Sequence, residues 1–257
     1  MKKITANLEN QRILGEVAKA NPVQRPEELC QIGLNRGYTT IVVIGADTTI
    51  NNLAPLIANK KATLGVIPLD KNSSFWNLLG CTNWEEACEI LPKRKLDIFD
   101  LGHIKPDHYF LTYIKIAPEE NKKPGSSQLP AQVNFGDFTT ESYVNEIIIT
   151  NGCDNPKLDI LEARAGYTDN MLSVYYYTKK GNKKGLFSKI FNPSTDKIFS
   201  SVFHTNKLII KHLEKPLTVF GPDNQIITKT PIEISVVPRI LKIIVGKLTW
   251  NYIWILI

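Results

Sequence analysis

The most regular feature of the sequence is the aliphatic run at residues 41–44 (Ile-Val-Val-Ile), which no polar residue interrupts. Such a run is typical of a strand that is buried on both faces, as in a parallel sheet covered by helices. The run stops at Gly45, where we expect a turn, and apolar residues then recur at helical spacing over 50–57. Thr48 or Thr49 is expected to cap this helix. The pattern therefore predicts a strand, a tight turn and a helix.

The rest of the first hundred residues continues this alternation. An almost wholly apolar run at 62–69 predicts the next parallel strand, and the helices are indicated by their first-turn and capping residues. The expected elements are a short strand at 11–18, a helix at 25–34, a strand at 62–69, a helix at 84–91 capped by Thr82 or Asn83, and a strand at 95–102. Strands that alternate with helices favour a parallel sheet built from beta-alpha-beta units.

From about residue 106 helical spacing becomes scarce, and short alternating runs separated by turn residues take over. The expected strands are 109–116, 131–135, 143–150, 158–165, 172–177, 207–210, 217–220, 225–229, 232–237 and 241–245. We therefore predict two domains. Residues 1–105 form an α/β domain with a truncated Rossmann-like parallel sheet, and residues 106–257 form an all-β, sandwich-like domain whose last segment packs back on the first.

Charge and cysteine usage narrow the function classes only modestly. The chain of 257 residues has 31 Lys and Arg against 25 Asp and Glu, which suits acidic partners such as anionic lipid or nucleotide. The net charge is the only feature that supports a nucleic-acid partner. The sequence does not determine the oligomeric state. The four cysteines and four histidines lack metal-ligand spacing, so no dedicated metal site is expected. We expect a cytoplasmic protein, since the N-terminus has no secretory pattern, with peripheral binding at the inner membrane face.

The predicted turn after the first buried strand is the leading candidate site. A strand that ends in a tight turn before a helix directs backbone N–H groups and the helix N-terminus toward phosphate-bearing ligands. Asp47 lies in this turn. The competing interpretation is that Asp47 only satisfies hydrogen bonds of the turn itself.

Five stretches, in order, resemble the catalytic domain of diacylglycerol kinases and bacterial lipid kinases, within the fold group that includes NAD kinases. Residues 45–49 (Gly-Ala-Asp-Thr-Thr) match the family's G-G-D-G-T, and residues 68–76 (Pro-Leu-Asp-Lys-Asn-Ser-Ser-Phe-Trp) match P-L-G-T-G-N-D-F-A. Residues 98–102 resemble the segment that leads into the β domain. Residues 168–174 are similar to D-D-G-L-L-D-V, and residues 220–225 stand where the family has D-G-E. The resemblance implies a NAD kinase/diacylglycerol kinase-like fold, with the family's N-terminal strand missing.

The resemblance also implies site residues. Asp47 and Asp169 would be the catalytic carboxylates, with ATP and Mg²⁺ as the cofactors. The nucleotide would be bound by residues of the two turns, namely Gly45, Ala46, Asp47, Thr48, Thr49, Asn51, Lys71, Asn72 and Ser73.

The departures from the family pattern bear directly on activity. Glycines allow close approach of a phosphate to the backbone, and here Ala46, Thr48, Asp70 and Asn72 replace them. Asp70 would also place a negative charge near a polyphosphate, where two like charges 4 Å apart repel by roughly 4 kcal/mol at a surface-like dielectric. The glutamates expected at residues 52 and 225 are amides, which can neither act as bases nor contribute charge toward magnesium.

Two functions remain open from the sequence. One is a lipid-kinase-like protein with weakened or lost catalysis that serves as a binding or regulatory module. The other is an active ATP-dependent kinase that phosphorylates a lipid hydroxyl such as that of diacylglycerol. Under either function, the basic and apolar segment from Lys179 to Phe191 is a candidate contact with anionic membrane, although a solvated loop explains it equally well.

Overall fold

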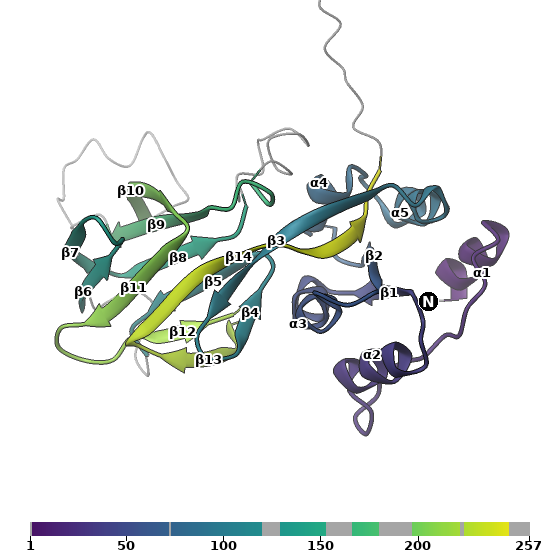
Figure 1. Ribbon diagram of the computed structural model, residues 1–257, viewed down its shortest axis with the longest axis horizontal. Helices are drawn as coiled ribbons and strands as arrows, with labels where there is room; N and C mark the ends of the chain where they lie inside the picture. The colour runs from purple at the N-terminus through teal and green to yellow at the C-terminus, as the bar shows by residue number, and fades with distance from the viewer. Residues whose placement is uncertain are drawn as a thin grey trace, which may run out of the picture. The chain divides into compact units, whose positions relative to one another are not determined.

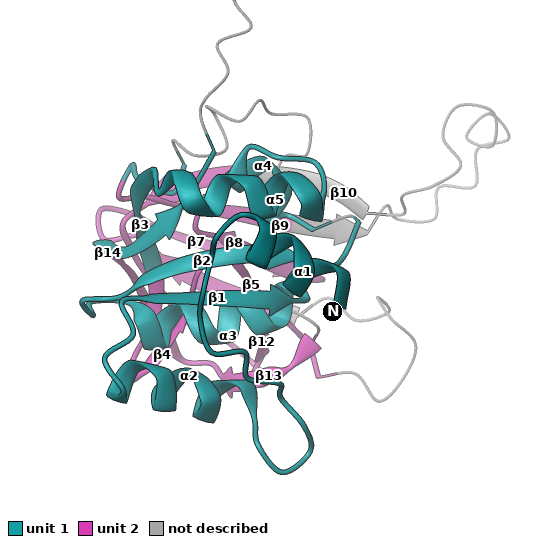
Figure 2. Cartoon of the chain, turned by 90° about the vertical axis from the view of Figure 1, so that its right-hand side faces the viewer, with its two compact units in different colours: residues 1–101, 152–169, 238–257 teal, residues 102–151, 170–237 magenta. Residues whose placement is uncertain are grey.

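The structure, a computed structural model, describes residues 2–71, 73–119, 129–152, 166–179, 197–221 and 224–246. The chain forms two compact units, each made of several segments (Figure 2). Unit 1 contains residues 1–101, 152–169 and 238–257, and unit 2 contains residues 102–151 and 170–237. We had expected one boundary after residue 105. The segments interleave because strands β3 (Leu96–Ile104) and β14 (Ile232–Ile244) each belong to both units (Figure 1).

Unit 1 is the α/β unit that the apolar runs predict. Strands β1 (Thr40–Gly45) and β2 (Thr63–Pro68) are parallel, with Thr40 opposite Thr63 and Gly45 opposite Pro68. Helix α3 (Asp47–Ile57) connects them, which confirms the beta-alpha-beta unit. The other helices are α1 (Lys2–Asn10), α2 (Pro26–Asn35), α4 (Phe75–Leu79) and α5 (Trp84–Ile90), followed by a 3-10 turn at Leu91–Lys93.

Strand β2, expected at 62–69, is buried at all six of its residues. It is an inner strand, since β1 pairs with one edge and Ile243 of β14 pairs with Leu64 at the other, and helices α3, α4 and α5 contact it. A strand covered on both faces needs a continuous apolar run, and that is the pattern in the sequence.

The start of α5 is fixed by a reciprocal cap. Asn83 Oδ1 accepts a hydrogen bond from the Glu86 amide at 2.9 Å, and Asn83 Nδ2 donates to Glu86 Oε1 at 3.0 Å. The Thr82 amide donates to Glu86 Oε2 at 2.8 Å, and this backbone bond is the main reason that the pKa of Glu86 is lowered. Of the two expected caps, Asn83 is therefore the one used.

Unit 2 is all-β. Its strands are β4 (His108–Phe110), β5 (Tyr113–Ala117), β6 (Leu129–Asn134), β7 (Thr139–Val144), β8 (Glu146–Thr150), β9 (Leu172–Lys179), β10 (Lys197–Thr205), β11 (Lys207–His212), β12 (Thr218–Phe220) and β13 (Ile226–Lys229), together with the first part of β14.

These strands form two antiparallel layers around one core. In one layer β14, β11, β6 and β7 pair in that order, and in the other the order is β10-β9-β8-β5-β12-β13. Val133 and Ile210 from the first layer and Ile147 and Val174 from the second are fully buried members of the core. Alternating apolar residues from both layers therefore build the sandwich that the sequence predicts.

Several sequence predictions are wrong in detail. Residues 13–20 contain no helix or strand, although a strand was expected at 11–18, and α1 was not foreseen. The expected strand at 109–116 is divided into β4 and β5, whereas 232–237 and 241–245 join as the single strand β14.

Three further segments complete the comparison. Strand β10 was not predicted. The expected strand at 158–165 lies outside the described residues, and so does the segment from Lys179 to Phe191 except for Lys179, which ends β9. Among the helices that the structure describes, none has the length and apolar character needed to cross a membrane.

Candidate functional site

The two turns that carry most of the predicted site residues lie next to each other. They follow β1 and β2, and because these strands are parallel and in register, their carboxyl ends meet at the same edge of the sheet. The Leu69 amide donates a hydrogen bond to the Gly45 carbonyl oxygen at 3.0 Å, so the turns begin side by side. The first turn leads into α3, and the second, residues 69–74, leads into α4.

With Thr48 or Thr49 as its cap, helix α3 would begin at residue 49 or 50, and it begins two or three residues earlier. Asp47 is its first residue, and the capping position is Ala46, whose side chain makes no cap hydrogen bond. The prediction that Thr48 or Thr49 is the cap is therefore wrong. Thr48 Oγ1 is instead buried with no hydrogen-bond partner in the described part of the chain, and Thr49 packs against Gly45, where an added Cβ would lie 3.2 Å from Thr49 Cβ.

The Asp47 carboxylate joins the two turns. Its Oδ1 accepts a hydrogen bond from Ser73 Oγ, and its Oδ2 accepts from the Ser74 amide at 2.9 Å and from Ser74 Oγ at 3.0 Å. Ser73 is buried, whereas Ser74 is exposed. We name this set of contacts the Asp47 clasp. A carboxylate is well placed here, because the first turn of a helix favours negative charge.

The second turn uses its own polar groups internally. The Ser73 amide donates to the Asp70 carbonyl oxygen at 3.2 Å, and the Phe75 amide donates to Ser73 Oγ at 3.1 Å. The Trp76 indole N–H also donates to the Asp70 carbonyl oxygen, at 2.9 Å. With the Ser74 amide held by Asp47, three successive amides of this turn, at residues 73–75, have acceptors within the protein.

The remaining predicted binding residues divide between the two turns. Asn51 is buried in α3, and its Nδ2 donates to the Asp47 carbonyl oxygen at 2.9 Å, so it supports the backbone of the first turn. Lys71 is exposed, and Asn72 lies outside the described residues. Sequence reasoning missed Ser74 as a contact of Asp47. The available signal was a pair of serines directly before the apolar start of α4.

The second predicted catalytic residue, Asp169, is exposed and is not among the hydrogen-bond partners of Asp47 in the described part of the chain. The segment before it is anchored to β3. The Asp100 amide donates to the Tyr167 carbonyl oxygen at 2.8 Å, and the ring of Tyr167 lies 5.6 Å from that of Phe99. The placement of Asp47 and Asp169 in one catalytic centre therefore stays a prediction.

Asp100 is a buried acid that sequence reasoning did not single out. Its carboxylate accepts a hydrogen bond from the Arg239 amide at 2.8 Å, where Arg239 has a positive φ of 53°. This contact explains how β14 passes Pro238 and Arg239 without ending. The signal in the sequence was an acid between two large apolar residues, Phe99 and Leu101, within a strand whose other acid is Asp97.

The described residues show no group of three metal-ligating side chains. Three of the histidines have hydrogen-bonding roles: His103 Nε2 lies 3.0 Å from the Pro106 carbonyl oxygen, His204 Nδ1 lies 3.0 Å from Ser173 Oγ, and His212 Nδ1 lies 3.2 Å from Thr230 Oγ1. These rings therefore connect neighbouring segments of unit 2.

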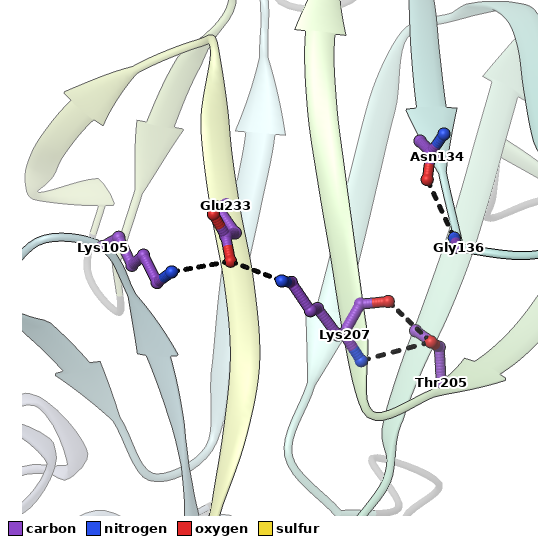
Figure 3. A network of polar contacts seen from close by, with 6 residues as sticks. All are labelled: Lys105, Asn134, Gly136, Thr205, Lys207 and Glu233. Atoms are coloured by element: carbon purple, nitrogen blue, oxygen red, sulfur yellow. Dashed lines mark hydrogen bonds and ion pairs between the residues drawn. The ribbon is translucent and has the colours of Figure 1, made fainter.

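The most charged polar network that the structure describes in unit 2 also connects strands (Figure 3). Glu233 Oε1 lies 2.8 Å from Lys105 Nζ and 2.9 Å from Lys207 Nζ. Hydrogen bonds from Lys105 and then Lys207 lower the pKa of Glu233 to about 2. Thr205 Oγ1 donates to the Lys207 carbonyl oxygen at 2.8 Å and so supports the start of β11. Because one carboxylate serves two ammonium groups, this network fastens β14 to β11 and to the end of β3.

The two turns that follow β1 and β2 form a corner of the sheet, and their contacts decide whether ATP with Mg²⁺ fits there. A nucleotide phosphate needs unoccupied N–H donors, and a magnesium ion needs carboxylate oxygens that can face it. Here the amides at residues 73–75 and both Asp47 oxygens are engaged by the protein itself. The second turn and the Asp47 carboxylate, as this structure places them, therefore do not fit a nucleotide phosphate with Mg²⁺.

The fold is that of diacylglycerol kinases and NAD kinases. A diacylglycerol kinase from Bacillus anthracis str. Sterne aligns with a TM-score of 0.70 and 17% identity, over 95% of this chain and 89% of that chain. An NAD kinase from Archaeoglobus fulgidus in complex with ATP aligns with a TM-score of 0.56 and 13% identity, over 95% of this chain and 88% of that chain. No family model and no curated protein matches the sequence. The likeness confirms the predicted fold, an α/β unit combined with a β unit.

Proposed function

We propose that this chain is a diacylglycerol-kinase-like protein of the lipid kinase family in which ATP-dependent lipid phosphorylation is weakened or lost, and which acts as a binding or regulatory module. The fold it shares with a diacylglycerol kinase supports the first part of this proposal. The proposed loss of catalysis rests on the turns after β1 and β2. Catalysis would need these turns to bind the nucleotide, whereas a binding role elsewhere on the fold would not.

The observation that carries the proposal is the Asp47 clasp. Phosphoryl transfer requires that protein groups position the phosphates and neutralise their charge. Where the amides and the carboxylate of the corner already bond within the protein, they are not available to the phosphates or to Mg²⁺. Asp47 is the carboxylate that the resemblance assigns to catalysis, and here Ser73 and Ser74 occupy its oxygens. The exposed Asp70 adds a further negative charge beside the turn.

The alternative is an active ATP-dependent kinase that phosphorylates a lipid hydroxyl such as that of diacylglycerol. It is favoured by the presence of Asp47 at the first turn of α3 and by the ATP held by the Archaeoglobus fulgidus NAD kinase of the same fold. In this case ATP and Mg²⁺ would be held by the turns after β1 and β2, and Asp169 would act on the lipid hydroxyl.

A transfer assay separates the two functions. The protein is incubated with Mg²⁺ and ATP labelled at the γ-phosphate, over vesicles that each contain one lipid alcohol, diacylglycerol among them. The proposal predicts either no label in any lipid above the level of the Asp47→Ala variant or a trace that stays below a single turnover per protein molecule. Labelled lipid that depends on Asp47 and accumulates over many turnovers would establish the active kinase instead.

We also propose that the segment from Lys179 to Phe191 contacts anionic membrane, because its lysines are interleaved with apolar residues. Co-sedimentation with vesicles that contain anionic lipid is expected for the unmodified chain. Reversing the lysine charges to glutamate should abolish it, and sedimentation that the reversal does not change would refute this contact.

A further inference from the structure

Strand β1 lies at one end of the larger sheet, and in the described part of the chain it pairs only with β2. The Thr63 amide of β2 donates to the Thr39 carbonyl oxygen at 3.0 Å, so the backbone of residue 39 faces β2. Because alternate residues of a strand face the same neighbour, the backbone groups of Thr40, Val42 and Ile44 face away from β2. The described hydrogen bonds include none from these outward backbone groups. We call this row of groups the β1 edge.

The other strands at the edges of the two sheets have features that discourage further pairing. Strand β7 exposes Glu141, β10 has a bulge between Phe199 and Ser201, β13 ends at the exposed Lys229, and β4 is only three residues long. Charges, bulges and short length are the usual means by which an edge strand avoids other strands. Strand β1 has none of them, since its register with β2 is continuous and residues 41–44 are all aliphatic. The β1 edge is therefore suited to accept another strand.

The side chains of β1 still have apolar surface that an added strand would cover. Ile41, Val42 and Ile44 are only half-buried, whereas all six residues of β2 are buried. Helix α2 covers one face of β1, because a Cβ at Gly33 would lie only 3.1 Å from Ile41 Cδ1. A strand beside β1 would therefore extend a sheet that already has a helix against one face.

The segment that joins α1 to α2 does not supply this strand. It contains no strand of its own, and its Glu16 carboxylate accepts hydrogen bonds from Arg36 Nη1 at 2.6 and 2.7 Å and from the Tyr38 hydroxyl at 3.2 Å. These contacts hold the segment at the end of α2. Leu14 and Val17 beside Glu16 are 87% and 63% exposed, so they do not pack along β1. The β1 edge is thus left for a strand from another polypeptide.

The charges at the two ends of β1 favour one direction for that strand. At the amino end, Arg94 Nη1 donates to Thr40 Oγ1 at 3.0 Å. Helix α2 leads directly into β1, so its first turn, with Glu27 and Glu28, lies toward the carboxyl end of β1, where Asp47 begins α3. An antiparallel strand would bring its last residues to the arginine and its first residues to the acids. Complementary charges at both ends therefore select a strand with a basic start and an acidic end.

We infer that the β1 edge binds one extended segment of another polypeptide, which adds to the sheet as an antiparallel strand. The segment is apolar on both faces opposite residues 41–44, begins with basic residues and ends with acidic ones. Its main chain pairs with residues 40, 42 and 44, which provides affinity, while its apolar side chains and its end charges provide specificity. This inference goes beyond the proposed function and does not rest on it, because the nucleotide corner takes no part in the pairing.

The test uses the full chain and the synthetic peptide Lys-Lys-Val-Ile-Val-Ile-Glu-Glu. The matched control peptide has the end charges exchanged, Glu-Glu-Val-Ile-Val-Ile-Lys-Lys. Hydrogen exchange of the backbone amides is followed by NMR as either peptide is added. The amides of Thr40, Val42 and Ile44 should gain protection, whereas those of Ile41 and Val43, which face β2, should not change. The control peptide should bind about threefold to tenfold more weakly, since exposed charge pairs contribute modestly.

Two variants of the chain test the backbone and the charges separately. Val42→Pro removes the central outward amide and leaves the bonds to β2, so it should abolish peptide binding. Glu28→Arg should weaken binding by about threefold. Its matched control is Glu85→Arg, at another exposed first-turn glutamate, in α5, and this control should bind like the unmodified chain.

Four outcomes would overturn the inference. The first is no added protection of the three outward amides at a peptide concentration of about 1 mM. The second is equal affinity for the two peptides, which would exclude the charge-directed orientation. The third is protection that rises with protein concentration in the absence of peptide, since a second copy of the chain would then occupy the edge. Should Val42→Pro not fold, Glu28→Arg decides, because an affinity equal to that of Glu85→Arg is the fourth.

Discussion

Replacement of Asp47 by alanine is expected to destabilise the protein, because its carboxylate serves as an acceptor inside the fold. The change leaves the buried Ser73 hydroxyl without its acceptor, which costs about 1–3 kcal/mol. Loss of the negative charge from the first turn of α3 adds about 0.3–1 kcal/mol. The exposed Ser74 recovers most of its bonding from water and adds little. We therefore expect a loss of about 1–4 kcal/mol in the free energy of unfolding.

The assay is equilibrium unfolding in urea at neutral pH, with the Asp70→Ala variant as the matched control. Asp70 is an exposed aspartate of the neighbouring turn, whereas Asp47 is half-buried, and Asp70 contributes only its backbone carbonyl to the described hydrogen bonds. Its replacement should change the free energy of unfolding by less than about 0.5 kcal/mol.

A neutral or stabilising effect of Asp47→Ala would refute this reasoning. Residues that are kept for ligand binding are often unfavourable for stability, so their removal tends to stabilise the fold. Replacing a carboxylate that serves only to bind a ligand would stabilise the fold or leave it unchanged. Replacing a carboxylate that joins two turns would destabilise it.

Three other changes test the packing, the capping and the charges of the fold. A Cβ at Gly102 would lie 2.1 Å from a ring carbon of the buried Phe110. Gly102→Ala should therefore lower the free energy of unfolding, measured in urea, by about 2–4 kcal/mol. Gly15 has open space around it, so Gly15→Ala should change this free energy little. Asn83→Ala removes the cap of α5 and should cost about 1 kcal/mol by the same measurement, and no loss would contradict the cap. Because the pKa of Glu233 is lowered to about 2, its contribution to stability is present above about pH 4.5 and is lost as the pH falls toward 2. Thermal unfolding across this range should show a smaller acid-induced loss in Glu233→Gln than in the unmodified chain, and identical pH profiles would contradict the network.

The predicted scaffold of unit 1 was largely correct because β1 and β2 are both continuous apolar runs, although only β2 is buried along its whole length and β1 is half-buried. Residues 41–44 and the run that forms β2 are continuous apolar segments. Such a segment is typical of a parallel strand that other elements cover. The strand expected at 11–18 failed for the opposite reason. A strand exists only with a pairing partner, and local sequence does not show whether a partner is present.

The error at β14, which runs through both units, has a similar origin. The sequence predicted two strands, at 232–237 and 241–245, but the Asp100 carboxylate accepts a hydrogen bond from the Arg239 amide and β14 continues through residues 238–240. The contact joins residues 139 positions apart, so no local pattern could predict it.

The candidate site shows the same limit. The resemblance implied that residues of the turns after β1 and β2 bind one nucleotide, and the structure places these two turns side by side. The sequence did not show that Ser73 and Ser74 would bind Asp47, since this depends on side-chain positions across the two turns. A motif therefore locates a corner of a fold, while its own polar groups determine whether that corner is open.

The most direct measurement of the closed corner is hydrogen exchange at the Ser74 amide, which donates to Asp47 Oδ2 at 2.9 Å. We predict that this amide exchanges more slowly than is usual in an exposed turn and that Mg²⁺–ATP does not change its exchange rate in the unmodified chain. The Asp47→Ala variant should lose this protection. An amide that exchanges at the unprotected rate in the unmodified chain would contradict the account.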